Sequence, residues 1–278
     1  AEDGESLYVH QGGIYSPTSQ ISINNFLESI LKRNPRADAE ALRKALEYSI
    51  SAHSAQVRKS GVPYAEHPLE VTKLLAEYQM DTPTLIAGLL HDVVEDTNTN
   101  LEEIQTLFGA EVAFMVDAVT KISMLQAESK EQQTAETYRK MLSSMAEDPR
   151  VLMIKIADRL HNMRTLSWMP TLSKRKLIAQ ETLDVYAPLA HRFGLAKVKA
   201  EMEDIAFQTL YPDEYSRVMK EILQYRTDRE SYIDKMTDMA VVALAGHGLE
   251  VQVQGRPKHI YSIWQKQKRR SCRLEQIY

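Results

Sequence analysis

The sequence predicts an all-α protein: a helical bundle, a helical linker region, and the first part of a truncated α/β domain. Nearly the whole sequence up to residue 246 reads as helix. Glycine and proline number only 10 each among 278 residues, which argues against a loop-rich or disordered chain. Residues 249–254 then alternate apolar and polar side chains, the period of a half-buried strand.

The first helices are predicted from their end signals. Asp38 is a candidate N-cap for a helix that runs to about residue 55. Residues 61–63 break the pattern, and Pro68 lies in the first turn of a second helix, which suits proline. Thr82 opens a third helix, which we expect to continue through residues 91–96.

The middle of the chain continues as short helices. Residues 98–100 form a turn and cap before a helix over residues 101–108, which Gly109 stops. Residues 125–130 are polar and predict a loop. Further helices are predicted at residues 111–120, 132–147 and 150–166.

The last part of the chain changes character. Ser173 begins a helix of about fifteen residues, by its apolar pattern, and residues 188–194 predict a bend. Helices are expected near residues 196–209, 213–245 and 258–270. One strand and one helix cannot bury a sheet face. We therefore predict four parts: an N-terminal tail (1–22), the main helical domain (23–195), a helical linker region (196–248) and the start of a truncated domain (249–278).

Composition excludes some classes of protein. Hydrophobic residues make up 44% of the chain, enough for a core, and the net charge of −4 defines no partner. No apolar run approaches the roughly 20 residues that span a bilayer, so no membrane association is expected. Residues 1–20 lack the apolar segment of a signal peptide. The single Cys272 excludes an internal disulfide and fits a cytoplasmic protein.

Four ionisable side chains follow an apolar run in the segment LLHDVVEDT. On a helix His91 faces Glu95, and Asp92 faces Asp96, because residues four apart share a face. Burying such charges is costly unless something compensates them. A divalent metal ion is the compensator that we predict.

Two other segments supply matching ligands. His53 lies near the end of the first core helix, and Asp158 follows an apolar stretch. With His91 and Asp92 they form a set of two imidazoles and two carboxylates, which suits Mn, Fe or Zn better than Ca or Mg. A metal held in this way lowers the pKa of bound water.

The neighbours of these ligands suit acid–base chemistry. Glu95 and Asp96 lie one turn beyond the HD pair, where a general base or water-orienting group belongs. Asn162 shares a helix face with Asp158 and is a candidate contact for substrate or bound water.

Each residue also has an ordinary structural interpretation. His53 alone is more often a satisfied core histidine, and Asp158 alone can pair with Lys155 or Arg159. Glu95 and its neighbour can be an acidic helix end, although the helix dipole opposes acids there. Taken together and in this order, the residues favour the metal site.

A basic run lies beside this constellation. Arg58, Lys59 and Ser60 precede Gly61, which lets a backbone approach a nucleotide closely. Arginine binds phosphate through two donors or stacks on a base. An ordinary basic helix end is an equal alternative. Three further residues are candidates to line the pocket or reach phosphate: Tyr64, His67 and Lys121.

A resemblance to the hydrolase half of the long RelA/SpoT-homologue (Rel) alarmone enzymes is carried by HSAQVRKSGVPYAEHP, LLHDVVEDT, VTKIS and MIKIADRLHNMRTL. It extends to ETLDVYAPLAHRFGL and GRPKHIYSIWQK, and so covers residues 23–278. The resemblance implies an all-helical HD domain followed by a nucleotidyltransferase-like synthetase domain. It also implies hydrolysis of the 3′-pyrophosphate of (p)ppGpp to GDP or GTP plus pyrophosphate, with Mn²⁺ as cofactor.

The resemblance also assigns roles by motif. It implies that the four proposed ligands hold Mn²⁺ and that Glu95 and Asp96 form the catalytic pair. It adds nucleotide contacts, which fall on Arg58, Lys59, Ser60, Asn162 and Thr165. Members of the family that have lost hydrolysis break the HD and ED motifs, whereas this sequence keeps both.

The C-terminal stretch is basic. Between residues 255 and 274 there are seven basic residues and no acid, which is typical of a phosphate or nucleic-acid patch. The resemblance implies part of a synthetase ATP site, led by Arg256 and Lys258. The chain ends before the rest of that domain, so we expect no (p)ppGpp synthesis from it. Trp264 reads as core, and no base-reading motif supports binding of nucleic acid or the ribosome.

Two rival functions remain. One is another HD-type nucleotide phosphohydrolase, which acts on dNTPs or cyclic dinucleotides. The other is a non-catalytic module that binds the alarmone and regulates an attached domain.

Overall fold

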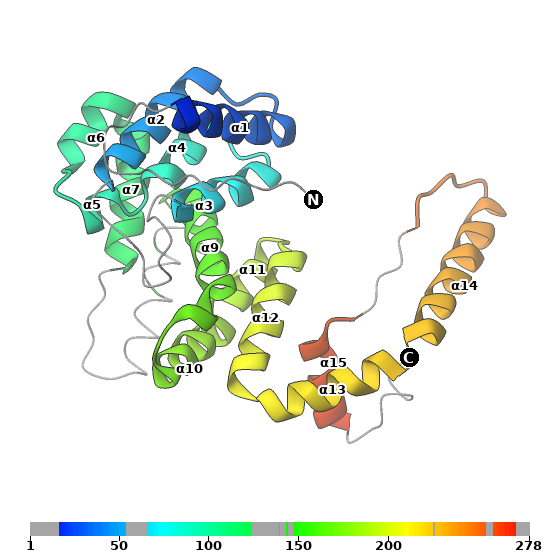
Figure 1. Cartoon of the computed structure of the whole chain (residues 1–278). Helices are drawn as coiled ribbons and strands as arrows, with labels where there is room; N and C mark the ends of the chain where they lie inside the picture. Colours follow the sequence, from blue (N-terminus) through cyan, green and yellow to red (C-terminus); the bar gives the residue numbers. More distant parts are fainter. Residues whose placement is uncertain are drawn as a thin grey trace. The chain divides into compact units, whose positions relative to one another are not determined.

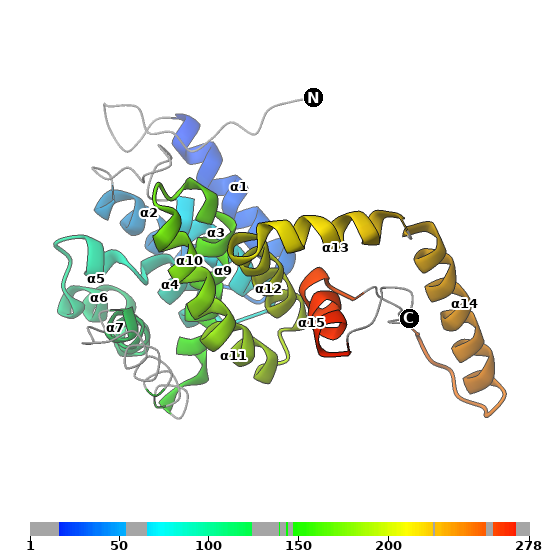
Figure 2. The same ribbon diagram turned by 90° about the horizontal axis from the view of Figure 1, so that it is seen from below.

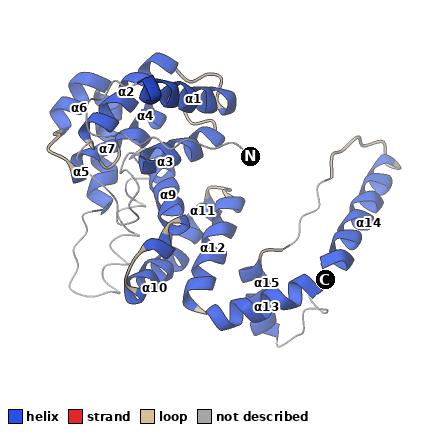
Figure 3. Ribbon diagram, viewed as in Figure 1, coloured by secondary structure: helices blue, strands red, loops and turns tan. Residues whose placement is uncertain are grey.

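The computed structural model describes residues 17–53, 66–123, 139, 143, 147–224, 226–253 and 258–270 (Figure 1). Within these ranges the regular elements are helices, and no strand occurs (Figure 3). The all-α prediction is therefore confirmed. No helix among the described residues is long and apolar enough to cross a membrane.

The helices of the N-terminal part begin with α1 at Pro17 and end with α9 at Arg164. In order they are α1 (Pro17–Arg33), α2 (Ala39–Ala52), α3 (Glu66–Glu77), α4 (Thr82–Leu90), α5 (Val93–Asp96), α6 (Leu101–Phe108), α7 (Ala110–Ser123) and α9 (Pro149–Arg164). The later elements are a 3₁₀ turn η1 (Leu166–Trp168), α10 (Leu172–Glu181), a π-helical turn η2 (Thr182–Tyr186), α11 (Ala187–Arg192), α12 (Ala196–Leu210), α13 (Pro212–Gln224), α14 (Arg226–Ala245) and α15 (Ile260–Arg270).

The chain divides into two compact units. The N-terminal unit comprises Ala1–Lys174 and Asp184–Tyr186, and the C-terminal unit comprises Arg175–Leu183 and Ala187–Tyr278. The predicted limits of tail, domain and linker at residues 22, 195 and 248 stay predictions.

Helix α4 is the centre of the N-terminal unit. It packs against α2, α3, α7 and α9, and all its residues from Thr84 to Leu90 are buried. A helix that is apolar all round needs neighbours on every side. Gly88 allows α3 to come close, because a Cβ there would lie 2.6 Å from Cδ1 of Leu75. The end of α4 is thereby held deep in the unit.

The predicted helix ends are largely confirmed. Asp38 caps α2 by accepting the backbone N–H groups of Glu40 and Ala41. Asn100 caps α6, and Gly109 ends it with a φ of +94°. Pro68 lies in the first turn of α3.

Two helix predictions were wrong. The helix that opens at Thr82 does not run on to residue 96: α4 ends at Leu90, and His91 and Asp92 form a turn before the separate short helix α5. The bend predicted for residues 188–194 is also wrong in its first part, and only residues 193–194 form a turn, in which Gly194 has a φ of +73°. Pro188 instead lies in the first turn of α11, directly after the π-helical turn η2, and a local π turn can accommodate the backbone hydrogen bond that proline cannot donate.

The C-terminal unit has its own apolar cluster, which joins α12, α13 and α15 (Figure 2). Its buried residues are Phe207, Val218, Ile263 and Trp264. The Trp264 indole lies 4.6 Å from the Phe207 ring, centroid to centroid, which confirms Trp264 as a core residue. Residues 249–253 are coil, and residues 254–257 and 271–278 lie outside the described residues. The α/β character of this segment stays a prediction.

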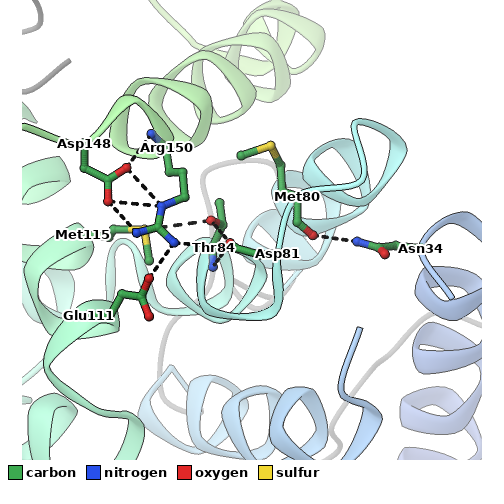
Figure 4. Close-up of polar contacts among 8 residues, drawn as sticks. All are labelled: Asn34, Met80, Asp81, Thr84, Glu111, Met115, Asp148 and Arg150. Atoms are coloured by element: carbon green, nitrogen blue, oxygen red, sulfur yellow. Dashed lines mark hydrogen bonds and ion pairs between the residues drawn. The ribbon is translucent and has the colours of Figure 1, made fainter. Parts of the chain in front are cut away.

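Arg150 joins the starts of three helices of the N-terminal unit (Figure 4). Its Nη1 donates to Asp81, the N-cap of α4, at 2.7 Å and to Glu111 in the first turn of α7 at 2.6 Å. Its Nη2 donates at 2.6 Å to Asp148, the N-cap of α9. The arginine thus fixes how α4 and α9 lie along one another.

Replacing Arg150 by methionine is expected to lower the free energy of unfolding by about 2 kcal/mol. Three carboxylates lose the charged donor that they share. Asp81 and Glu111 contribute little to the expected loss of stability, because both are half-exposed. Urea unfolding followed by circular dichroism measures the loss. The matched control is Arg217→Met, because Arg217 also bridges two acids but lies exposed on α13. Equal losses in both variants would contradict the role of Arg150.

Candidate metal centre

Ends of three helices and the middle of a fourth meet at one buried place in the N-terminal unit. His53 is the C-cap of α2, and His67 is the second residue of α3. His91 is the C-cap of α4, Asp92 follows it, and Asp158 lies in the middle of α9. All five side chains are buried, with residue exposures between 2% and 7%.

Three of these residues form a group that could hold a metal ion. One ligand atom from each of His67, His91 and Asp158 lies within 4.8 Å of the others. Nε2 of His67 is 3.2 Å from Oδ1 of Asp158, and Nε2 of His91 is 3.9 Å from the same oxygen. Imidazole nitrogen with carboxylate oxygen is a donor set for Mn, Fe or Zn.

Asp92 faces the same place. Nε2 of His53 lies 3.3 Å from its Oδ1, and Nε2 of His91 lies 4.0 Å from its Oδ2. Both oxygens are buried, and no donor in the described part of the chain meets either one with hydrogen-bond geometry. A buried carboxylate left in this way is costly unless a cation compensates it, so Asp92 fits a metal ligand.

The orientation of His91 also favours a cation. Its Nδ1 lies 2.9 Å from the carbonyl oxygen of Gly88, which can only accept, so Nδ1 carries the proton. In the neutral ring Nε2 is then a bare acceptor, and it faces the carboxylates of Asp92 and Asp158. An acceptor turned toward two further acceptors is a metal-binding arrangement.

His67 is oriented from behind by another histidine. Its Nδ1 lies 2.6 Å from Nδ1 of the buried His161, so the two imidazoles share one proton. This contact fixes the ring of His67 with Nε2 toward Asp158.

The two oxygens of Asp158 have different partners. Oδ1 accepts a hydrogen bond from Nδ2 of Asn162 at 2.6 Å, and Oδ2 accepts from Nζ of Lys155 at 2.8 Å. Burial by itself raises the pKa of Asp158, but the Lys155 ammonium and the imidazoles of His67 and His91 outweigh it and hold the pKa well below its usual range. Asp158 is therefore ionised.

The group of three differs in one histidine from the predicted ligand set, which stays a prediction. His91 and Asp158 lie in the group, and its third member is His67, which the sequence analysis named only as a pocket-lining residue. His53 is not a member of this group, and its Nε2 lies beside Oδ1 of Asp92. One sequence feature could have identified His67 as a site residue. It directly precedes Pro68 in the first turn of a helix, where a side chain can lie against the end of another helix.

The other predicted site residues are placed less centrally. Glu95 and Asp96 are exposed on the separate turn α5. Thr165 is the C-cap of α9, and its hydroxyl donates to the His161 carbonyl. Lys121 is exposed and pairs with Asp117 at 2.5 Å. The basic run Arg58, Lys59 and Ser60, together with Gly61, Tyr64 and Arg256, lies outside the described residues.

Lys258 lies in a pocket of about 610 Å³ in the C-terminal unit. Its lining is rich in basic side chains, among them Lys199, Lys258, Lys266, Arg269 and Arg270. The basic stretch predicted from the sequence thus contributes to one concave surface.

Asp92 should make the stability of the metal-free protein depend on pH. Burial raises its pKa, but the imidazoles of His91, His53 and His67 lower it, to about 2. Because this value lies below the roughly 3.9 of an unfolded aspartate, the ionised group stabilises the fold above pH 4, and that contribution is lost as the pH falls toward 2. Urea unfolding should show that the parent is more stable than Asp92→Asn by about 1–3 kcal/mol at pH 7. This difference should shrink below pH 4.

The exposed Asp234 provides the control for this pH dependence. Asp234→Asn should leave the stability within about 0.5 kcal/mol of the parent at every pH. A gap between parent and Asp92→Asn that stays constant from pH 7 to pH 3 would contradict the low pKa of Asp92.

Residues 45–196 match the family model described as "HD domain". These residues contain the whole constellation described above, and the match spans more than half of the chain. The protein therefore belongs to the HD-domain family. HD-domain hydrolases bind a divalent metal, which agrees with the group of His67, His91 and Asp158.

Within that family the chain is homologous to enzymes of alarmone metabolism. It is 44% identical over 264 residues to a guanosine-3′,5′-bis(diphosphate) 3′-pyrophosphohydrolase of Aquifex aeolicus, covering 95% of this chain and 37% of the relative. It is 44% identical to a GTP pyrophosphokinase of Myxococcus xanthus (90% and 33% covered) and 41% identical to the bifunctional (p)ppGpp synthase/hydrolase SpoT of Escherichia coli (92% and 36%). The chain thus spans about a third of the length of these curated relatives.

Proposed function

We propose that this chain hydrolyses the 3′-pyrophosphate of (p)ppGpp to GDP or GTP and pyrophosphate, with Mn²⁺ as its metal. The observation that carries the proposal is the buried group of His67, His91 and Asp158 beside the ionised Asp92. The named activities of the relatives, a 3′-pyrophosphohydrolase and a synthase/hydrolase, supply the substrate class.

His67, His91, Asp92 and Asp158 are the proposed ligands of the metal. His53 then supports Asp92 from 3.3 Å away instead of binding the metal as the sequence had predicted. The bound Mn²⁺ would lower the pKa of a water molecule and polarise a phosphoryl oxygen. Asn162 holds the Asp158 carboxylate in place for this.

Glu95 and Asp96 are the proposed acid–base pair. They lie on the turn α5, directly after the ligand Asp92, and are exposed to solvent, where substrate can reach them. Their role is to orient or deprotonate the water that attacks the phosphorus on the ribose O3′. The departing pyrophosphate needs cations to offset its charge, and Arg58, Lys59 and Lys121 are the candidates.

The remaining substrate contacts are proposed from the motif. Ser60, Asn162 and Thr165 would contact the nucleotide, and Thr165 lies one turn beyond Asn162 at the end of α9. Lys258 and Arg256 are proposed to contact the phosphates of a synthetase ATP site. A cytoplasmic location, without a nucleic-acid or ribosome partner, completes the proposal.

Two alternatives compete. Another HD-type phosphohydrolase would use the same ligands on dNTPs or cyclic dinucleotides, and a non-catalytic module would bind the alarmone without cleaving it. The retained ligands count against a non-catalytic module, and the names of the relatives favour the alarmone.

Release of pyrophosphate from ppGpp, measured with Mn²⁺ and after chelation, tests the proposal. We expect turnover of ppGpp only with the metal. Parallel assays on dGTP and cyclic di-GMP should give no product. Turnover of dGTP in place of ppGpp would support the first alternative, and tight ppGpp binding without cleavage would support the second.

A further inference from the structure

Lys155 is a buried cation beside the proposed metal site. It lies on α9 one turn before Asp158, and only 8% of the residue is exposed. Its Nζ lies 2.8 Å from Oδ2 of Asp158. The other cation that the sequence offered to Asp158 is directed elsewhere, since the Arg159 guanidinium lies over the Tyr186 ring, 4.0 Å from its centroid.

The charges of the site are unbalanced without a metal. Asp92 and Asp158 carry two buried negative charges, and Lys155 contributes one positive charge when the imidazoles are neutral. The Lys155 ammonium is held in a close, buried ion pair with the Asp158 carboxylate. Without Lys155 the metal-free centre would hold two buried carboxylates. Among the ion pairs of the described residues, no other lysine or arginine would then balance these two charges.

A cation in this position can act on metal binding in two opposite ways. A partner that only orients a ligand increases metal affinity, and its removal typically weakens binding by about 10- to 100-fold. A fixed positive charge on the same carboxylate instead repels an incoming divalent cation. The burial of the pair favours repulsion, because solvent screens buried charges little. Orientation of Asp158 is moreover already provided by Asn162 on its other oxygen.

We propose that Lys155 is the internal counter-ion of the metal-free site. It balances Asp158 while the metal is absent, and it weakens metal binding by its charge. The enzyme thus keeps a stable metal-free fold and exchanges its metal more readily. This proposal rests on the metal site of the proposed function.

Three variants test the proposal by Mn²⁺ titration, with free Mn²⁺ followed by electron paramagnetic resonance. Lys155→Met should bind Mn²⁺ about tenfold tighter than the parent or better, whereas Lys155→Arg, which keeps the charge, should stay within about threefold. The matched control is Lys73→Met. Lys73 pairs with Glu70 at the same i,i+3 spacing, 2.6 Å apart, but the pair is half-exposed on α3. Its Mn²⁺ affinity should not change.

Thermal unfolding in a chelator measures the other half of the proposal. Lys155→Met leaves Asp158 buried without its cation, so its metal-free melting temperature should fall by several degrees. Adding Mn²⁺ should then raise that temperature more in the variant than in the parent.

A double variant covers the case in which Lys155→Met does not fold without metal. Lys155→Met combined with Asp158→Asn removes both charges, and its metal-free melting temperature should exceed that of either single variant. Weaker or unchanged Mn²⁺ binding in Lys155→Met, or a double variant no more stable than the single variants, overturns the proposal. Failure of the parent itself to bind Mn²⁺ would contradict the proposed function instead.

Discussion

Replacing His67 by alanine is expected to weaken Mn²⁺ binding by more than about 100-fold and to abolish pyrophosphate release from ppGpp. Loss of a direct ligand should exceed the 10- to 100-fold effect of changing a residue behind a ligand. Nε2 of His67 is 3.2 Å from Oδ1 of Asp158 and belongs to the group that can hold the ion. Calorimetric titration with Mn²⁺ and the pyrophosphate assay measure the two effects.

His53→Ala is the matched control for this prediction. His53 is equally buried, at 2% exposure, and its Nε2 lies 3.3 Å from Oδ1 of the proposed ligand Asp92. Its loss should weaken Mn²⁺ binding by about 10- to 100-fold and leave measurable turnover at saturating metal. If His53→Ala abolished binding while His67→Ala kept it, the ligand set read from the sequence would be right and the geometric one wrong.

Replacing Glu95 by glutamine and Asp96 by asparagine together is expected to lower ppGpp hydrolysis by about 10²- to 10⁴-fold, the usual contribution of general acid–base catalysis. Mn²⁺ binding should stay within about threefold of the parent, because both side chains are exposed on α5 and outside the ligand group. Single-turnover assays at saturating Mn²⁺ separate the chemical step from metal binding.

Glu102→Gln combined with Glu103→Gln is the control for that pair. Both glutamates are exposed in the first turn of α6, so the variant removes the same two charges from a nearby surface. It should keep parental turnover. A double variant of Glu95 and Asp96 that cleaves ppGpp at the parental rate would remove this pair from the mechanism.

The helix ends were predictable because they depend on local chemistry. Asp38 and Asn100 cap helices with their own side chains, and Gly109 takes a positive φ. The break after Leu90 was missed, because it lies in an unbroken run of helix-compatible residues. Only packing of α4 against four neighbours fixes where that helix ends.

The part of the site that depends on local sequence patterns was also predictable. His91 and Asp92 are adjacent in sequence, and Asp158 follows a clear apolar stretch. The choice between His53 and His67 depends on which helix end meets α9, and sequence spacing carries no information about that contact. The bond between His67 and His161 joins residues 94 apart and could be found only in three dimensions.

The wide separation of the ligands along the chain has a kinetic consequence. Residues 67, 91 and 158 meet only after long loops have closed, and such contacts form late in folding. Mn²⁺ therefore finds no preformed site in the early folding chain and cannot act as its template. The ion should instead slow unfolding, with little effect on the rate of folding.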